Sequence, residues 1–208
     1  MKPTNQKEID EHEATGHAVY RAWCAHCVGA YGIEHQHRMV NRAAHELPVV
    51  SCDFFYMGQD EEKCVPMLAV VDNRTKAIAA SALPDKKTTT RYNVKFLSDF
   101  YKGLGYNRIV DKSDNEHSMV SLKLAAVRDA GVEGVPKESP VGDHAANGEV
   151  ENVVKDIKRK VRANKSALEA KLKMKLDDRD PVVLWLPRFS GDQISRFKIG
   201  ADGKSAEQ

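Results

Sequence analysis

The chain has 208 residues, which is enough for one domain of moderate size and a small additional segment. Its hydrophobic content of 41% and charged content of 30% indicate a water-soluble protein with a core, and the formal net charge of +2 does not by itself indicate nucleic-acid binding. The sequence shows neither an apolar run long enough to span a membrane nor a signal-peptide pattern. We therefore expect an intracellular protein of the nucleus or cytoplasm, without a membrane partner and not secreted.

Residues 1–45 differ in composition from the rest of the chain. They contain the thiols of Cys24 and Cys27, and they hold most of the histidines, namely His12, His17, His26, His35, His37 and His45. Two cysteines separated by two residues are typical of a zinc site, because soft thiolates at that spacing can share one ion. A tetrahedral site needs two further ligands. We predict that residues 1–45 form a His/Cys-rich arm or a partial zinc-binding module.

The elements expected after this segment alternate between apolar strands and amphipathic helices. We predict strands at 49–57, 67–71, 76–80, 108–112 and 132–135, and helices at 91–103, 117–130 and 148–175. Thr88 or Thr90 is expected to cap the first helix, and Gly191 and Gly200 suggest a loosely packed C-terminal end. Three strands followed by alternating helices and strands predict an α/β fold with a mixed sheet.

Three acidic side chains lie on rigid elements or directly at their ends. Asp53 lies within the first strand, Asp114 directly follows the fourth, and Glu151 lies in the first turn of the long helix, where the helix dipole favours a carboxylate. Carboxylates held on rigid elements make a site for hard divalent cations, and two such ions can drive phosphoryl transfer. From the residues alone, three ordinary surface acids among the 30 acidic residues remain an open explanation.

The segments around these three acids resemble the catalytic motifs of retroviral and retrotransposon integrases. Asn147-Gly148-Glu149-Val150-Glu151 is similar to the segment around their catalytic Glu, Ser113-Asp114-Asn115-Glu116 to that around their second Asp, and Ser51-Cys52-Asp53-Phe54 lies where the first Asp belongs. The separation of the last two acids, 151 − 114 = 37 positions, is close to the roughly 35 residues that the family places there. The resemblance runs from about residue 12 to the C-terminus.

The resemblance implies a ribonuclease-H-like mixed five-stranded sheet flanked by helices, with an integrase catalytic core at 46–190 and a flexible tail at 191–208. It implies that Asp53, Asp114 and Glu151 are catalytic and bind two Mg²⁺ or Mn²⁺ ions. It also implies 3′-end processing and strand transfer, with element ends and target DNA as partners and a homo-oligomer as the active form. The family's register selects Glu151 over the neighbouring Glu149, and Asp111 and Asp143 are the other nearby acids. We expect the chain to be part of a larger polyprotein.

A row of cations follows Glu151 along the long helix. Lys155, Lys158, Arg162 and Lys165 lie four, seven, eleven and fourteen positions after it on one face, beside an apolar stripe of Val150, Val154, Ile157 and Val161. Such a row can follow a DNA backbone into the site, although a solvated helix face would look the same. In integrases, basic residues one and two turns past the Glu contact DNA ends, which implies this role for Lys155 and Lys158. We extend the DNA-binding prediction to Arg162.

The family also precedes its catalytic core with a His-His-Cys-Cys zinc module, whose cysteine pair is matched by Cys24 and Cys27. The family places the histidines some two dozen residues or more before that pair, whereas His17 and His12 lie only seven and twelve positions before Cys24. Three interpretations stay open: His12 and His17 close a compact zinc site, the chain is a truncated copy that lacks the true histidines, or the segment is an arm with free thiols. Cys52 and Cys64 are expected to be core or near-surface thiols.

Two other functions remain possible at this stage. A ribonuclease-H-like nuclease that only hydrolyses would need the same three acids. An inactive nucleic-acid-binding remnant of a retroelement polyprotein would need none of them, and the presence of all three acids speaks weakly against it.

Overall fold

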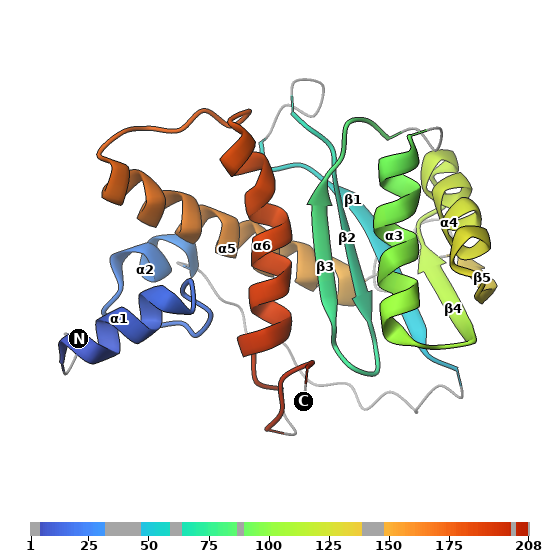
Figure 1. The fold of residues 1–208 in the computed structure, drawn as a ribbon, viewed down its shortest axis with the longest axis horizontal. Coiled ribbons are helices and arrows are strands. Elements are labelled where there is room, and N and C mark those ends of the chain that lie inside the picture. The colour runs from blue at the N-terminus through green and yellow to red at the C-terminus, as the bar shows by residue number, and fades with distance from the viewer. Residues whose placement is uncertain are drawn as a thin grey trace.

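The computed structural model of the protein describes residues 5–31, 47–58, 64–86, 90–138, 148–200 and 203–207. Its centre is a mixed five-stranded sheet of order β3-β2-β1-β4-β5 (Figure 1). The strands are β1 (Val49–Phe55), β2 (Met67–Asp72), β3 (Ile78–Ala82), β4 (Arg108–Ser113) and β5 (Glu133–Glu138). The pairs β1–β2 and β2–β3 are antiparallel, whereas β1–β4 and β4–β5 are parallel. The predicted mixed sheet is confirmed.

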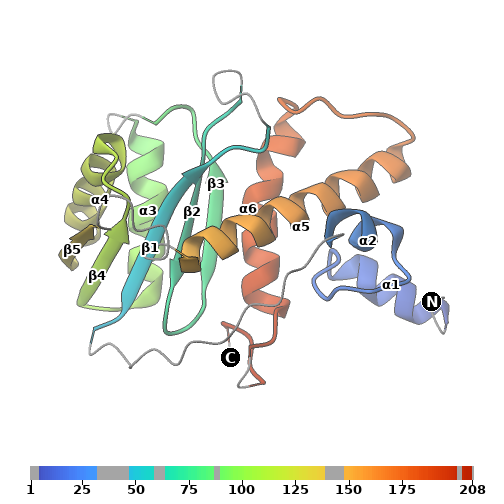
Figure 2. The ribbon, with the colours of Figure 1, turned by 180° about the vertical axis from the view of Figure 1, so that it is seen from behind.

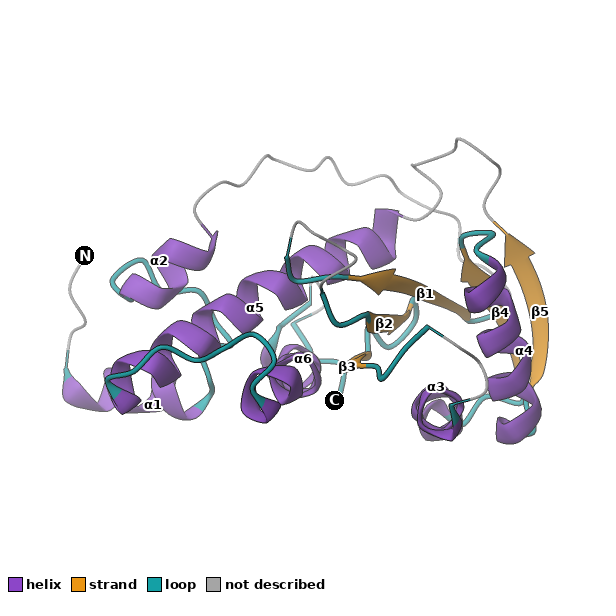
Figure 3. Cartoon of the chain, turned by 90° about the horizontal axis from the view of Figure 1, so that it is seen from above, coloured by secondary structure: helices purple, strands orange, loops and turns teal. Residues whose placement is uncertain are grey.

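Helices cover both faces of this sheet. The helices α3 (Arg91–Leu104) and α4 (His117–Ala130) lie on one face, and α5 (Gly148–Leu172) crosses the other, as the view from above shows (Figure 3). The last helix, α6 (Pro181–Phe197), runs along β3. The short helices α1 (Gln6–Ala14) and α2 (Ala25–Tyr31) lie beside the C-terminal half of α5 (Figure 2). No helix in the described part of the chain is both long enough and apolar enough to cross a membrane.

The strand residues divide into two cores because successive side chains point to opposite faces. Val50 and Cys52 of β1 pack toward α3 and α4 in one buried cluster, and Phe55 packs toward α5 in the other. Asp53 alternates with Cys52 and shares the parity of Phe55, so it faces the side of the sheet that α5 covers. Cys52 is fully buried and is therefore a core thiol, as expected.

The helix ends follow the glycine signals of the sequence. Gly105 and Gly131 end α3 and α4 with φ of 69° and 72°, the left-handed conformation that glycine adopts without strain. Thr90 is the N-cap of α3, but its hydroxyl donates to the Asp85 carboxylate rather than capping a backbone N–H. Six residues named above lie outside the described residues, namely His35, His37, His45, Thr88, Asp143 and Asn147.

The C-terminal end differs from the expectation. The tail was predicted to begin at residue 191, but α6 continues to Phe197, and Gly191 is buried against β3. A Cβ atom on Gly191 would lie 3.0 Å from the Ala80 nitrogen, so this glycine allows the helix to approach the strand closely. The Ser195 hydroxyl donates to the Ile78 carbonyl at 2.9 Å and accepts from the Ile78 N–H at 2.8 Å. The helix thus covers the edge of the sheet, and the inference of loose packing at Gly191 was wrong.

Candidate functional site

Sheet topology brings two of the three predicted acids onto neighbouring strand ends. In the parallel pair of β1 and β4, Ser51 lies opposite Lys112. Continuing that register by two residues places Asp53 opposite Asp114, which directly follows β4. Since the two positions have the same parity, both carboxylates belong to the sheet face that α5 crosses. Glu151 lies in the first turn of α5, between the buried Val150 and Val153 that anchor this helix to that face.

The charges of the other two acids act on the Asp53 carboxyl. Burial raises the pKa of the Asp53 carboxyl to about 7; the charge of Asp114 adds to this, and smaller contributions come from Glu151 and Glu116. A hydrogen bond from the Phe54 backbone N–H acts in the opposite direction. The structure therefore brings the three predicted acids within reach of one another's fields. Carboxylates arranged in this way repel unless protons or cations neutralise them.

Two neighbouring acids, Asp111 and Glu149, lie next to lysines of the protein itself. Asp111 points to the opposite face, where its carboxylate lies 3.7 Å from the Lys123 ammonium and where burial raises its pKa to about 6, against the charge of Lys123. Glu149 pairs with Lys76 at 2.8 Å, next to the β2–β3 turn. Asp111 and Glu149 are thus occupied by cations of the protein itself. The charge of Glu151, in contrast, acts on Asp53.

A cation near the acids was not found by sequence reasoning. The Lys86 ammonium pairs with Glu116 at 3.0 Å and lies 5.0 Å from the centre of the Phe54 ring and 5.3 Å from that of Tyr56. Glu116 is one of the groups that raise the pKa of Asp53, so Lys86 lies at the margin of the same site. No motif marks this lysine, because its position depends on the path of the chain after β3.

The predicted two-faced character of α5 is present, although the row of cations is shorter than expected. Val150, Val154, Ile157 and Val161 are buried. Lys155 and Arg162 are exposed, and the Lys158 ammonium lies over the Phe55 ring, 5.9 Å from its centre. Lys165, which closed the predicted row, instead pairs with Asp178 in the segment before α6. The face of α5 that follows Glu151 therefore carries three cations of the predicted row, namely Lys155, Lys158 and Arg162.

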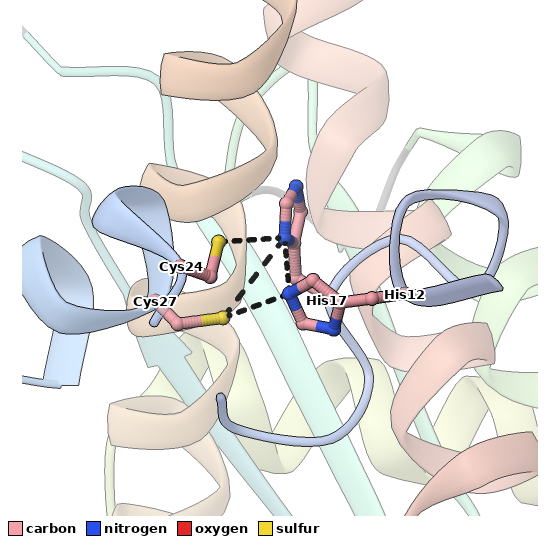
Figure 4. Close-up of side chains that lie close together, drawn as sticks. All are labelled: His12, His17, Cys24 and Cys27. Atoms are coloured by element: carbon pink, nitrogen blue, oxygen red, sulfur yellow. Dashed lines mark hydrogen bonds between the residues drawn. The ribbon is translucent and has the colours of Figure 1, made fainter. Parts of the chain in front are cut away.

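The N-terminal segment forms a second candidate site. The ligand atoms of His12, His17, Cys24 and Cys27 all lie within 4.8 Å of one another, and all four residues are buried (Figure 4). The Nδ1 atom of His17 is 2.9 Å from Nε2 of His12 and 3.4 Å from the Cys24 sulfur, and the Cys27 sulfur is 3.4 Å from Nε2 of His12. Of the three interpretations left open, this geometry supports the compact site closed by His12 and His17.

The local chain path explains how four donors meet within sixteen residues. The helix α1 ends at Ala14, and the left-handed backbone of Gly16 and His17, with φ of 59° and 60°, turns the chain back across its own last turn. The His17 N–H donates to the His12 carbonyl at 3.0 Å, which fixes this return. The second helix then begins at Ala25, between the two cysteines. The two histidines and the two thiols consequently face one another.

The protonation states of this cluster suit metal binding. Burial lowers the pKa of His17 to about 4 and also lowers that of His12, so both imidazoles are neutral at pH 7, the form that binds metal. Burial raises the pKa of the Cys27 thiol to about 11, so an ion must displace its proton. Two thiolates and two imidazoles in a closed, buried arrangement are the ligand set of a structural zinc site.

The N-terminal segment is packed against the core rather than separate from it. His26 contacts the Ser166 hydroxyl at 2.7 Å, Glu13 pairs with Lys171 at 2.8 Å, and the Gln193 amide donates to the Thr15 carbonyl at 3.1 Å. A Cβ atom on Gly16 would overlap the Gln193 side chain, at 1.5 Å from its nitrogen. We call residues 5–31 the N-terminal module, and it is joined to both α5 and α6.

Comparison with known proteins gives a result only at the level of structure. No protein-family model matches the sequence, and no curated protein matches it. The catalytic core domain of HTLV-2 integrase, determined in complex with magnesium in a trimeric form, is similar with a TM-score of 0.50 and 13% identity, over 77% of this chain and 93% of that one. A chain from the structure of the simian T-cell lymphotropic virus intasome with PP2A regulatory subunit B56 gamma is similar with a TM-score of 0.57 and 14% identity, over 84% of this chain and 59% of that one. The protein therefore has the ribonuclease-H-like fold of retroviral integrase catalytic cores.

Proposed function

We propose that this protein is an integrase-like polynucleotidyl transferase that trims a DNA 3′ end and joins the freed 3′-hydroxyl to target DNA. The observation that carries the proposal is the placement of Asp53, Asp114 and Glu151 on an integrase-type fold, with the charges of Asp114 and Glu151 both acting on the Asp53 carboxyl. The similar HTLV-2 core was determined in complex with magnesium, which supports a divalent cation as the partner of these acids. Mg²⁺ or Mn²⁺ fits a set of oxygen ligands, since both are hard cations.

The protein's own contribution is to position charge. The three carboxylates would hold two cations in a fixed orientation, because one belongs to β1, one directly follows β4 and one belongs to α5. Such ions, when bound, supply a lower pKa for the attacking hydroxyl or water and neutralise the charge of the phosphate. Lys155, Lys158 and Arg162 would bind phosphates of the DNA and align its end with the acids. This division of roles needs no covalent intermediate with the protein.

The proposal is tested with a labelled DNA duplex carrying an element-type end, in Mg²⁺ or Mn²⁺. The native chain should nick the duplex and join the trimmed strand to target DNA. Glu151→Gln keeps the side-chain shape and removes a cation-binding charge, so both products should fall at least about 100-fold. Glu149→Gln is the matched control, because that side chain pairs with Lys76 instead, and it should retain activity within a few-fold. Equal activity of native chain and Glu151→Gln would overturn the proposal.

The same assay separates the two alternatives. A nuclease of this fold would nick the DNA with metal but never join it to a target. An inactive binding remnant would retain DNA affinity and a folded circular-dichroism spectrum, with no metal-dependent product.

For the N-terminal module we propose one structural zinc ion held by His12, His17, Cys24 and Cys27. The support is the buried cluster of two thiols and two neutral imidazoles. Metal analysis of the purified chain should give one zinc per protein. We also propose that the protein self-associates, as the trimeric form of the similar HTLV-2 core suggests, and light scattering would test this.

A further inference from the structure

One lysine at the margin of the carboxylate site has partners on two other parts of the chain. The Lys86 ammonium lies 3.0 Å and 3.3 Å from the two carboxylate oxygens of Glu116. It also lies 5.0 Å from the centre of the Phe54 ring and 5.3 Å from that of the Tyr56 ring. Lys86 belongs to the segment between β3 and α3, whereas Phe54 belongs to β1 and Glu116 to the segment between β4 and α4. The lysine therefore joins the end of β1 to the residues that follow β4.

The backbone that carries Lys86 is held in place by α3. The preceding residue, Asp85, accepts from the Thr90 hydroxyl through its carboxylate at 2.9 Å. Its carbonyl accepts from the side-chain amide of the fully buried Asn93, also at 2.9 Å. The Lys86 side chain is only 30% exposed, so its ion pair with Glu116 is screened less than a pair between fully exposed groups. The fold therefore directs this ammonium to Glu116.

Glu116 is an acid that could compete with the three predicted ones. It lies two residues after Asp114, and the lysine that it binds contacts the ring of Phe54, the residue next to Asp53. An unpaired carboxylate at this position would be a further hard oxygen ligand for the same divalent cations. It would then compete with the phosphate of a DNA substrate for those cations. The ion pair with Lys86 gives this carboxylate a different partner.

We infer that Lys86 is a positioning residue of the carboxylate site, where it holds Glu116 away from the bound cations and so limits their protein ligands to the three predicted acids. The inference rests on the proposed function. Lys86 acts through Glu116, and the cations keep coordination positions for phosphate oxygens of the DNA, which two-metal phosphoryl transfer requires. Loss of the lysine should therefore strengthen cation binding and at the same time slow the reaction.

The test measures Mn²⁺ binding to the full native chain and to Lys86→Met in the absence of DNA, with electron paramagnetic resonance of the free ion. The substitution keeps an unbranched side chain of similar length and removes the charge. Mn²⁺ should bind about 3- to 10-fold more tightly, because a positive charge is lost and Glu116 becomes unpaired. At saturating Mn²⁺, the same variant should form joined DNA product at least about 10-fold more slowly than the native chain. A lysine that only supports the fold would weaken both binding and activity.

Three further variants separate this role from a general effect of charge. Adding Glu116→Gln to Lys86→Met removes the competing acid, so Mn²⁺ affinity should return to within about 3-fold of the native value. Lys86→Arg keeps a cation that can bind Glu116 and should also retain native affinity. Lys102→Met is the matched control, because Lys102 of α3 pairs with Asp129 at the same distance of 3.0 Å, and it should leave Mn²⁺ affinity and product formation unchanged.

A second substitution guards against a folding defect in the first. Lys86→Gln keeps polarity at this position and should show the same tighter binding of Mn²⁺, with circular dichroism confirming the fold of each variant. Unchanged or weaker Mn²⁺ binding in both Lys86→Met and Lys86→Gln would overturn the inference. Failure of the native chain to bind Mn²⁺ more tightly than Asp114→Asn would instead overturn the carboxylate site on which the proposed function depends.

Discussion

The carboxylate site and the Cys/His cluster are built in opposite ways. The acids come from positions 53, 114 and 151, which only the sheet topology and the α5 crossing bring together. The Cys/His ligands come from positions 12 to 27 and meet because one turn and two short helices fold back on themselves. Burial and the charges of Asp114 and Glu151 raise the pKa of Asp53, whereas the cluster is assembled from neutral groups in mutual contact. Carboxylates that repel one another need a bound cation to neutralise their charge, whereas a cluster of neutral groups can form before its metal ion binds.

The two sites also differ in their access to water. Asp114 is exposed and Asp53 and Glu151 are half-buried, so a substrate phosphate could reach them. The four Cys/His residues are all buried, as is usual where a metal has a structural role and no open coordination position is needed. This contrast predicts which perturbations should affect stability and which should affect chemistry.

The largest effect is expected where the buried cluster loses a ligand. Cys27→Ser should abolish the single zinc and lower the zinc-loaded free energy of unfolding by more than about 4 kcal/mol, because loss of a structural metal is among the most damaging of substitutions. Metal analysis and chemical denaturation measure both. Cys64→Ser, at a half-buried thiol outside the cluster, is the control and should keep the zinc. Retention of a full zinc equivalent by Cys27→Ser would remove that cysteine from the ligand set.

The next effect concerns the Asp53 carboxylate, whose charge is disfavoured by burial and by the charge of Asp114. The pKa of Asp53 is raised to about 7 in the folded protein, so the native state holds this proton more tightly than the unfolded chain, and folding stability falls as pH rises from about 4 to 7. Asp53→Asn removes the charge, so in magnesium-free buffer at pH 8 it should stabilise the protein, by on the order of 2–4 kcal/mol. The gain should disappear below about pH 4.

Saturating Mg²⁺ provides the control for this effect. It should stabilise the native chain at pH 8 and leave Asp53→Asn almost unchanged. An equal benefit of the substitution at pH 4 and pH 8 would show that side-chain packing, not charge, is responsible.

A smaller effect is expected at the turn that assembles the cluster. Gly16 has φ of +59°, and a methyl group there would overlap the Gln193 side chain. Gly16→Ala should therefore cost about 1–2 kcal/mol of stability and weaken zinc binding, since the turn joins His12 to His17. Gly103→Ala, where a new Cβ meets no atom within 4 Å, is the matched control and should be neutral or stabilising. Denaturation and chelator competition on both variants would show whether the local turn assembles the cluster.

The smallest effect in free energy is expected at the proposed DNA-binding surface of α5. Lys155→Ala should weaken DNA binding a few-fold and reduce the slope of log affinity against log salt concentration by about 1, because one phosphate contact is lost. Lys95→Ala on α3, which lies on the other face of the sheet, should leave the slope unchanged. Salt titrations of a fluorescent duplex measure both. Equal slopes for the two variants would exclude Lys155 from the DNA surface.

Local signals in the sequence were sufficient for most elements. The helix at 117–130 has the predicted bounds, and the strands predicted at 67–71 and 76–80 correspond to β2 and β3, because the spacing of apolar residues is a property of neighbouring residues. The predicted C-terminal boundary of the core, at residue 190, was wrong. A glycine inside a helix suggests loose packing unless the strand against which the helix packs is known. Gly191 is instead the position where α6 meets Ala80.

The sequence alone determined the composition of both sites: three acids at element ends, and two thiols with histidines close by in the chain. It also determined the apolar stripe that anchors α5. Only the tertiary structure decided that Lys165 pairs with Asp178 and that Glu149 pairs with Lys76. Periodicity in the sequence assigns a residue to one face of its own helix. The charged partner of that residue comes from another segment of the chain, and tertiary packing sets the position of that segment.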